Sequence, residues 1–202
     1  MRPVFAYFAA LTLIAAGSSQ AAVSPTTVLL QFEQPHAEKT LQEVRSELSS
    51  IMKDAGLTFE LRLFSELSPW TEFGDLMVVR LKGRCRLDAS SVPPQDKGPL
   101  AFTHTSDGKV LPFVEVACDR IRAAVRPVLW GEQLRHTDEL MGRALARVIA
   151  HEIYHIVAGT GAHGGSGVAR HALSGAQLIA EHLSFTAEDV ERMIVAGASG
   201  SI

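Results

Sequence analysis

The sequence predicts an α+β fold, with several strands, two long helices and a small C-terminal helical part. Two observations lead to this prediction. Between residues 26 and 117, short segments with apolar residues at every second position are interrupted by a single helical pattern. Helical patterns then follow, and a run of strands before a run of helices is typical of α+β proteins.

The N-terminal part of this pattern predicts a strand, a helix and a strand. Thr27 to Phe32 is an apolar run rich in β-branched residues, and residues 37–55 repeat apolar side chains at helical spacing until Gly56. The residues of that helical stripe are Leu41, Val44, Leu48, Ile51 and Met52. From Leu57 to Phe64, apolar and polar residues alternate with the period of a half-buried strand.

Three further strands are predicted before the second long helix. Asp75 to Cys85 alternates apolar residues with arginine and lysine, whereas the prolines and glycine between Val92 and Pro99 predict a loop. Leu100 to Thr105 and Val110 to Ala117 flank the sequence Ser106-Asp107-Gly108-Lys109. An Asp-Gly pair between two alternating segments predicts a β-hairpin.

The second long helix has the clearest limits in the sequence. Thr137 is a suitable N-cap, Asp138 and Glu139 place negative charge in the first turn, and Glu139 can pair with Arg143. Two neighbouring stripes at helical spacing predict a buried helix. They are Leu145, Ile149, Ile153 and Ile156, and Ala144, Val148, His151 and His155. Gly159 follows the last periodic residue and predicts the end of the helix.

The segments on either side of this helix show weaker patterns. Arg120 to Gly131 has no clear periodicity, and we expect Pro127 and Trp130 to pack a connection rather than to line a cleft. Gly175 to Phe185 is compatible with a short amphipathic helix. A last helix is predicted to start after Thr186, which is followed by acidic residues suited to a first turn.

The second long helix carries the motif His151-Glu152-x-x-His155. Residues four apart lie one turn above each other on a helix, so both imidazoles can reach one metal ion. Glu152 lies beside such an ion, where its carboxylate can accept a proton as a general base. H-E-x-x-H on a helix is the pattern of a zinc hydrolase.

With this motif the chain resembles the zincin metallopeptidases, and within them the metzincin branch, whose signature is H-E-x-x-H-x-x-G-x-x-H. In that signature the glycine turns the chain and the last histidine completes the zinc site. In this sequence three residues rather than two separate His155 from Gly159, and three rather than two separate Gly159 from His163. The methionine turn of the family has no evident counterpart, because the only downstream methionine is Met193, in the predicted last helix.

A catalytic zinc generally takes three protein ligands and leaves a fourth position for water. His163 is the leading candidate for the third ligand, since a reversal at Gly159 brings it back over the helix end. The alternatives are His171, Glu181 and His182. Glu181 would correspond to the gluzincin branch, which takes a glutamate from a downstream helix, although Glu181 and His182 also suit solvated helix positions.

The predicted order of strands and helices also resembles the N-terminal half of a metzincin, which implies a zincin-like fold with a mixed, twisted sheet, a backing helix and an active-site helix. The resemblance further implies a zinc-dependent endopeptidase that hydrolyses peptide bonds with a zinc-activated water and with Glu152 as general base. The implied ligands of Zn2+ are His151, His155 and His163. It further implies that a peptide or protein substrate pairs with Leu100 to Thr105, as the edge strand of the sheet. Two alternatives stay open: a catalytically silent, zincin-like binding protein of the envelope, and a zinc hydrolase of a non-peptide amide.

Hydrolysis also needs a group that stabilises the developing oxyanion. The sequence does not identify it, because Tyr154 lies two residues beyond Glu152 and is expected on another side of the helix. Arg170 and His171 are candidates for this role, but both are interpreted rather as surface residues.

The N-terminus predicts an exported protein. Residues 1–22 resemble a secretory signal peptide, with Arg2, an apolar stretch from Val4 to Ala16, and small residues near Ala21. The apolar stretch is shorter than the roughly 20 residues of a membrane span, so we expect no stable membrane anchor after cleavage. A secreted or periplasmic location follows, and there the two cysteines, Cys85 and Cys118, are expected to form a disulfide.

Length, composition and charge limit the classes of protein that remain. Residues 23–202 suit one domain, which we expect to be a monomer. Hydrophobic residues make up 47% and charged residues 20% of the sequence, which is neither membrane-like nor disordered. A net charge of -3 argues against nucleic acid as a partner. The alternating basic residues, Arg80, Lys82, Arg84 and Arg86, are interpreted as a solvated face.

Overall fold

The computed structural model describes residues 26–87 and 98–199. The predicted signal peptide, residues 1–22, and most of the proline-rich loop lie outside the described residues. Within them, the strands are β1 (Thr26–Phe32), β2 (Phe59–Leu63), β3 (Leu76–Lys82), β4 (Ala101–Ser106) and β5 (Lys109–Ala117). The helices are α1 (Glu38–Asp54), α2 (Cys118–Val125), α3 (Thr137–Val157), α4 (Gly175–Ile179) and α5 (Ala187–Ser199). Short 3-10 turns are η1 (Phe64–Glu66), η2 (Arg126–Val128) and η3 (Gly131–Arg135).

The strands form one mixed sheet in the order β2-β1-β3-β5-β4. The neighbours from β2 to β5 pair in parallel, whereas β4 pairs antiparallel with β5 and lies at an edge. Asp107 and Gly108 both have positive φ, 51° and 75°, as a two-residue hairpin turn requires. The predicted α+β class, the hairpin and the edge position of the fourth strand are confirmed.

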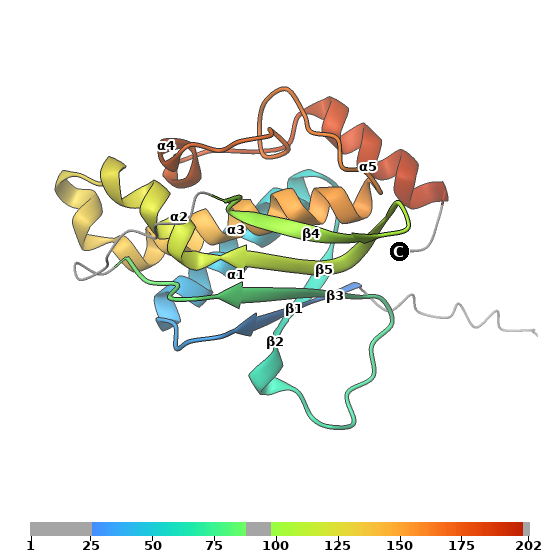
Figure 1. The fold of residues 1–202 in the computed structure, drawn as a ribbon, viewed down its shortest axis with the longest axis horizontal. Coiled ribbons are helices and arrows are strands. Elements are labelled where there is room, and N and C mark those ends of the chain that lie inside the picture. Colours follow the sequence, from blue (N-terminus) through green and yellow to red (C-terminus); the bar gives the residue numbers. More distant parts are fainter. Residues whose placement is uncertain (1–25, 88–97, 200–202) are drawn as a thin grey trace, which may run out of the picture.

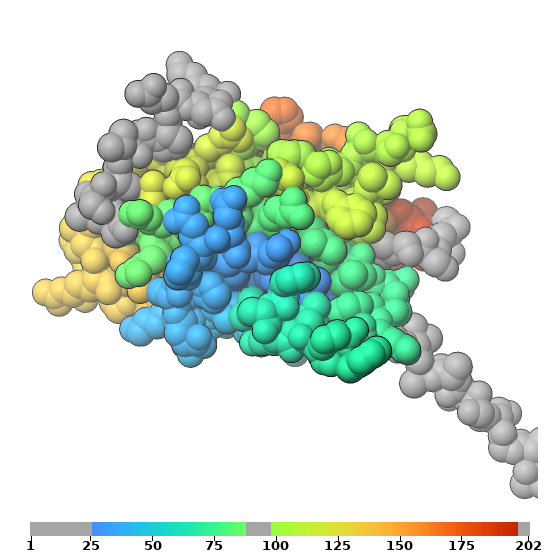
Figure 2. Space-filling model, turned by 60° about the horizontal axis from the view of Figure 1, so that its bottom comes forward, coloured from blue at the N-terminus to red at the C-terminus, as the bar shows by residue number. Residues whose placement is uncertain are grey.

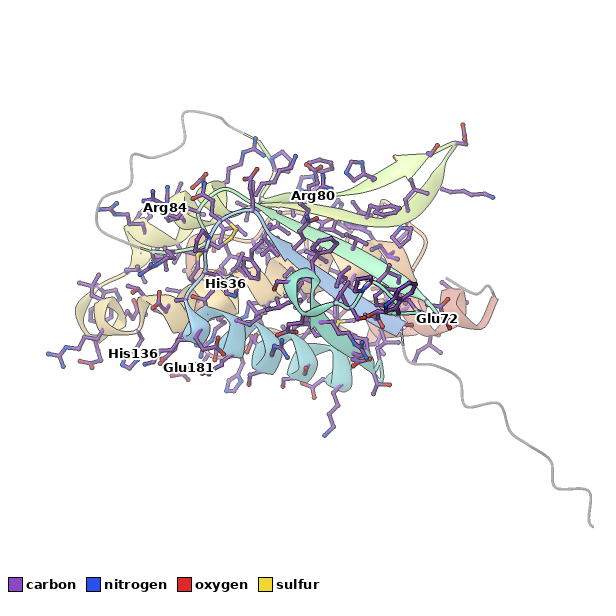
Figure 3. The ribbon with its side chains drawn as sticks, turned by 90° about the horizontal axis from the view of Figure 1, so that it is seen from below. His36, Glu72, Arg80, Arg84, His136 and Glu181 are labelled. Atoms are coloured by element: carbon purple, nitrogen blue, oxygen red, sulfur yellow. A yellow bond between two sulfur atoms is a disulfide. The ribbon has the colours of Figure 1, made fainter. Side chains whose placement is uncertain are left out.

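Helices α1 and α3 run along one face of the sheet, and the C-terminal segment with α4 and α5 follows on the side of β4 (Figure 1). The alternate residues of β3 that face these helices, Met77, Val79 and Leu81, are buried as the pattern predicts. Arg80 lies on the other side of the sheet, away from α1 (Figure 3). On the surface, β2 and the segment that follows it (teal) lie beside β1 and α1 (blue, Figure 2). The α3 helix is therefore enclosed between the sheet, α1 and the C-terminal segment.

Close packing and a buried ion pair fix α3 against α1. A Cβ atom at Gly142 would lie 2.5 Å from the backbone oxygen of Thr40, so only glycine allows this approach of the two helices. One turn further on, Arg147 is fully buried; its Nε donates to Glu47 at 2.7 Å and its Nη1 to the carbonyl of Gln177 at 2.7 Å. The ion pair with Glu47 ties α3 to α1, and the hydrogen bond to Gln177 ties α3 to α4. Both interactions hold the helix that carries the metal motif.

The start of α3 differs from the prediction. The helix begins at Thr137 itself, after His136, and no side chain caps it, so the N-cap assignment of Thr137 is wrong. The expected pair of Glu139 with Arg143 is also wrong, because Glu139 contacts His136 while Arg143 pairs with Glu43 of α1. Arg143 therefore forms an ion pair between two helices rather than within α3. The end of α3 is as predicted, since Gly159 has a φ of +57° two residues after Val157.

The segment before α3 is more helical than the sequence indicated. Residues 120–131, which lack a clear pattern, contain most of α2 and all of η2. Pro127 and Trp130 do not pack a connection as expected: both are exposed, Trp130 by 76%. The apolar contacts of this segment come instead from Ile121 and Val125, which are fully buried.

The C-terminal segment corrects one prediction and confirms another. The helix considered for Gly175 to Phe185 ends at Ile179, because Ala180 has an extended backbone with a ψ of 157°. Further along, the carbonyl of Ser184 accepts the N–H of Val168 at 3.0 Å. The predicted start of the last helix is confirmed. There Thr186 and Asp189 each accept the other's backbone N–H, which is a capping box.

The remaining sequence predictions concern the cysteines, the basic run and the membrane. Cys85 and Cys118 form the predicted disulfide and join the end of β3 to the start of α2. The four basic residues from Arg80 to Arg86 are exposed, and Lys82 pairs with Glu115. Among the described residues, none of the helices combines the length and the apolar character needed to cross a bilayer.

Candidate metal centre and catalytic cleft

Three of the predicted site residues converge at the C-terminal end of α3. His151 and His155 lie one turn apart on this helix, and the reversal after Gly159 returns the chain to them at His163. One nitrogen of each imidazole lies within 4.8 Å of the others. Within the described residues, these three histidines are therefore a group that could hold a metal ion.

Backbone carbonyls determine which nitrogen of each helical histidine carries a proton. Nδ1 of His151 lies 2.8 Å from the oxygen of Val168, and Nδ1 of His155 lies 2.7 Å from the oxygen of Thr160. A carbonyl oxygen can only accept, so both Nδ1 atoms are donors and, in the neutral ring, both Nε2 atoms carry a lone pair. The two Nε2 atoms are 3.1 Å apart. Two lone pairs at this distance repel unless a cation lies between them.

Burial keeps these imidazoles neutral. It lowers the pKa of His151 and of His155, because a charged ring would lose its hydration. The pKa of His163 is lowered to about 4 by burial and by the neighbouring histidines. Neutral imidazole is the form that binds a metal, so the group is ready to coordinate near neutral pH.

The spacing of the two helical histidines is compatible with a tetrahedral metal site. In a tetrahedral site with Zn–N bonds of about 2.0 Å, neighbouring nitrogens are roughly 3.3 Å apart. The 3.1 Å between the Nε2 atoms of His151 and His155 is close to that value. Three imidazoles suit zinc or another transition metal, whereas Ca2+ and Mg2+ prefer oxygen.

No protein-family model matches the chain, and comparison with curated proteins and with solved structures finds no significant match. The fold and the site are therefore interpreted from their own geometry. The resemblance to the metzincins rests on the motif alone and remains an expectation.

Glu152 lies beside the histidines and is held by the edge strand. Glu152 is only 5% exposed, and its Oε2 accepts a hydrogen bond of 2.6 Å from the hydroxyl of Thr103 on β4. Burial raises the pKa of this carboxyl group, while the bond from Thr103 opposes that rise. A raised pKa makes the carboxylate of Glu152 a stronger base, as a proton acceptor in catalysis requires.

A cleft opens over the histidines between β4 and the segment after α3. Its volume is about 500 Å³. Thr103 and Thr105 of β4 line one wall, the three histidines and Glu152 line the floor, and residues 170–173 line the other wall. The candidate metal centre is thus reached from a groove that follows an edge strand.

The alternative third ligands lie outside the histidine group. Glu181 and His182 are exposed and follow the end of α4. His171 lies closer, with its ring centroid 4.6 Å from that of His163, and it lines the cleft together with Arg170. Both residues had been interpreted as surface positions; both are exposed, yet they belong to the wall of the cleft.

Two functional features could not be read from the sequence. Thr103 is an ordinary strand residue there, and only the antiparallel pairing of β4 brings its hydroxyl to Glu152. The second feature is the carbonyl of Val168, which accepts from His151 although the two residues are 17 positions apart in the sequence. Tyr154 lies away from the cleft as expected: it is fully buried, and its hydroxyl accepts a hydrogen bond from Arg192 of α5.

Proposed function

We propose that the protein is a zinc-dependent endopeptidase of the zincin type. The observation that carries the proposal is the pair of Nε2 lone pairs on His151 and His155, 3.1 Å apart and fixed in that tautomer by backbone carbonyls. His163 supplies the third nitrogen, and Glu152 lies next to the group without belonging to it. This arrangement of three neutral ligands and a separate carboxylate suits hydrolysis better than structural metal binding.

Zinc bound by these histidines would supply a nucleophilic water at neutral pH and polarise a carbonyl group. The residues of the chain supply the rest. Glu152 accepts the proton of the attacking water and later donates it to the leaving amine. Thr103 keeps the carboxylate of Glu152 in place by donating to Oε2 at 2.6 Å, so the other carboxylate oxygen stays available for the proton.

The edge strand offers a way to position an extended peptide. Strand β4 pairs on one side only, with β5, and its other side lines the cleft. An extended chain can add to such an edge through backbone hydrogen bonds. A peptide bound along β4 would cross the floor formed by His151 and Glu152, which favours a peptide over a small amide as substrate.

An exported protein fits the same proposal. The Cys85–Cys118 disulfide is the kind of cross-link that persists in an oxidising compartment. We therefore propose secretion or export to the periplasm, with residues 1–22 as the signal peptide.

Digestion of an unfolded protein tests the proposed function. We expect the zinc-loaded chain, without residues 1–22, to cleave reduced, alkylated proteins at internal bonds, which mass spectrometry would detect as new termini. Chelation should abolish cleavage and added zinc should restore it. If a folded chain that contains one zinc ion leaves every peptide bond intact, the endopeptidase proposal fails.

Replacement of Thr103 by valine tests how Glu152 is held. Thr103→Val removes a hydrogen bond that stabilises the charged form, so the pKa of Glu152 should rise further. The base is then protonated over a wider acidic range, so the acidic limb of the kcat/KM profile should move to higher pH, and kcat/KM should fall more on that limb than on the plateau. Thr105→Val is the matched control, since Thr105 also lines the cleft from β4. An unchanged acidic limb in Thr103→Val would contradict this role.

A further inference from the structure

One wall of the cleft carries an arginine with no acidic partner. Arg170 is exposed, lines the cleft and forms no ion pair within the described residues. Other arginines of α1 and α3, such as Arg45, Arg143 and Arg147, each pair with a glutamate. Arg170 is therefore charged and available in the groove that leads to the histidines.

The backbone fixes Arg170 beside the metal centre. Arg170 forms a parallel β-bridge with Gly164, the neighbour of His163, and the N–H of Gly164 donates to the carbonyl of Ala169 at 2.8 Å. Val168 and Ala169, which precede Arg170, are fully buried, and the carbonyl of Val168 accepts from His151. The segment that carries Arg170 thus also holds two of the histidines in place, and its position relative to them is set.

The charges in the cleft favour an anionic group at this wall. Among the described residues that line the cleft, Glu152 is the only acidic one, and Oε2 of its carboxylate already accepts the hydrogen bond from Thr103. The facing residues on the other wall are neutral, Thr103 and Thr105 among them. A carboxylate that enters beside Arg170 therefore gains a cation and meets no opposing charge on the facing strand.

We propose that Arg170 selects substrates that carry a carboxylate next to the scissile bond. This specificity rests on the proposed peptidase function and deepens it. The carboxylate could come from an aspartate or glutamate side chain or from the C-terminus of a short peptide, because a guanidinium pairs with either in the same bidentate manner. Arg170 acts here through substrate binding, so its removal changes preference among substrates.

Matched peptides test the proposal. Each peptide has one cleavable bond and differs only in Glu, Gln or Lys at the residues that flank it, with a free or amidated C-terminus. The wild-type chain should cleave the Glu peptide with a kcat/KM roughly 5- to 30-fold above that of the Gln peptide, between the effects of exposed and desolvated charge pairs. The preference should weaken at high salt. If the Glu and Gln peptides are cleaved equally well but amidation lowers kcat/KM for both, the terminal carboxylate is the group recognised.

Substitutions assign the preference to Arg170. In Arg170→Gln the ratio of kcat/KM for the Glu peptide to kcat/KM for the Gln peptide should fall to about one. In Arg170→Glu the Lys peptide should become a better substrate than the Glu peptide. Arg135→Gln is the control: Arg135 is exposed, pairs with Glu132 and does not line the cleft, so the ratio should stay at its wild-type value. A wild-type ratio near one together with no effect of amidation, or a preference that is unchanged in Arg170→Gln, overturns the proposal while cleavage itself still supports the peptidase.

A binding measurement separates this inference from the proposed function. The zinc-loaded Glu152→Gln chain should bind the labelled Glu peptide more tightly than the Gln peptide in fluorescence anisotropy, and Arg170→Gln should abolish the difference. If no peptide is cleaved but this difference is found, recognition by Arg170 stands and the peptidase proposal fails. If neither cleavage nor a difference in binding is found, both are overturned.

Discussion

Glu152→Gln is expected to lower kcat/KM by about 10³-fold, within the range of a lost general base, while the chain still binds one zinc ion. Glutamine keeps the size of the side chain and can accept the hydrogen bond from Thr103, but it cannot accept a proton. The histidines are untouched, so metal content should stay at one per chain. Steady-state cleavage of a quenched peptide, with zinc measured by atomic absorption, gives both quantities.

Although Glu152→Gln should lose activity, it should not lose stability. Burial raises the pKa of Glu152, so the charged carboxylate costs free energy in the folded state above the pKa of the unfolded chain. Its neutral isostere avoids that cost, and the free energy of unfolding of Glu152→Gln at pH 7 should equal or exceed that of the wild type. Such an exchange of stability for activity is common at catalytic sites.

Glu139→Gln is the control for both measurements. Glu139 is also a glutamate of α3, but it lies in the exposed first turn, where it pairs with His136. Its activity should match the wild type. If Glu152→Gln keeps more than a tenth of the wild-type activity and this activity is still abolished by chelation, the general base lies elsewhere.

Local patterns in the sequence were sufficient for most elements of the fold. The strands, α1, α3 and the start of α5 follow from alternation, helical periodicity and residues such as Gly56, Gly159 and Thr186, because each signal acts within a few residues. The motif likewise places His151, Glu152 and His155 on one helix. Local patterns therefore predict well the helix on which His151, Glu152 and His155 lie.

Contacts between distant segments could not be predicted in this way. Arg143 pairs with Glu43 instead of with Glu139, and beyond the end of α4 the carbonyl of Ser184 accepts the N–H of Val168. The bond from Thr103 to Glu152 spans 49 residues of sequence and depends on the register of the β4–β5 hairpin. Single-sequence periodicity contains no information on such registers, so the residues that orient His151 and Glu152 were missed, whereas the group of three histidines was predicted.

Zinc is expected to stabilise the folded chain strongly, by about 4 kcal/mol when free zinc is 1,000 times its Kd, because the three histidines are assembled only in the folded state. Chemical denaturation of the Glu152→Gln chain, which cannot digest itself, measures this free energy with and without zinc. Because zinc competes with protons for neutral imidazole, the pKa values set its pH dependence. The pKa of His163 is about 4, and those of His151 and His155 are also lowered, so affinity should change little between pH 8 and 6 and fall toward pH 4.

His163→Gln separates the role of the third ligand from that of the fold. His151 and His155 also bond to backbone carbonyls, so their removal would disturb the turn that follows α3, whereas His163 contacts the group mainly through its ring. The apo variant should unfold as the wild type does, and zinc should bind at least 100-fold more weakly and lose most of its stabilising effect. His182→Gln, an exposed histidine outside the group, should behave as the wild type. If His171→Gln rather than His163→Gln removes the stabilisation by zinc, then the imidazole 4.6 Å further along the wall is the third ligand, and the longer reversal after Gly159 serves to reach it.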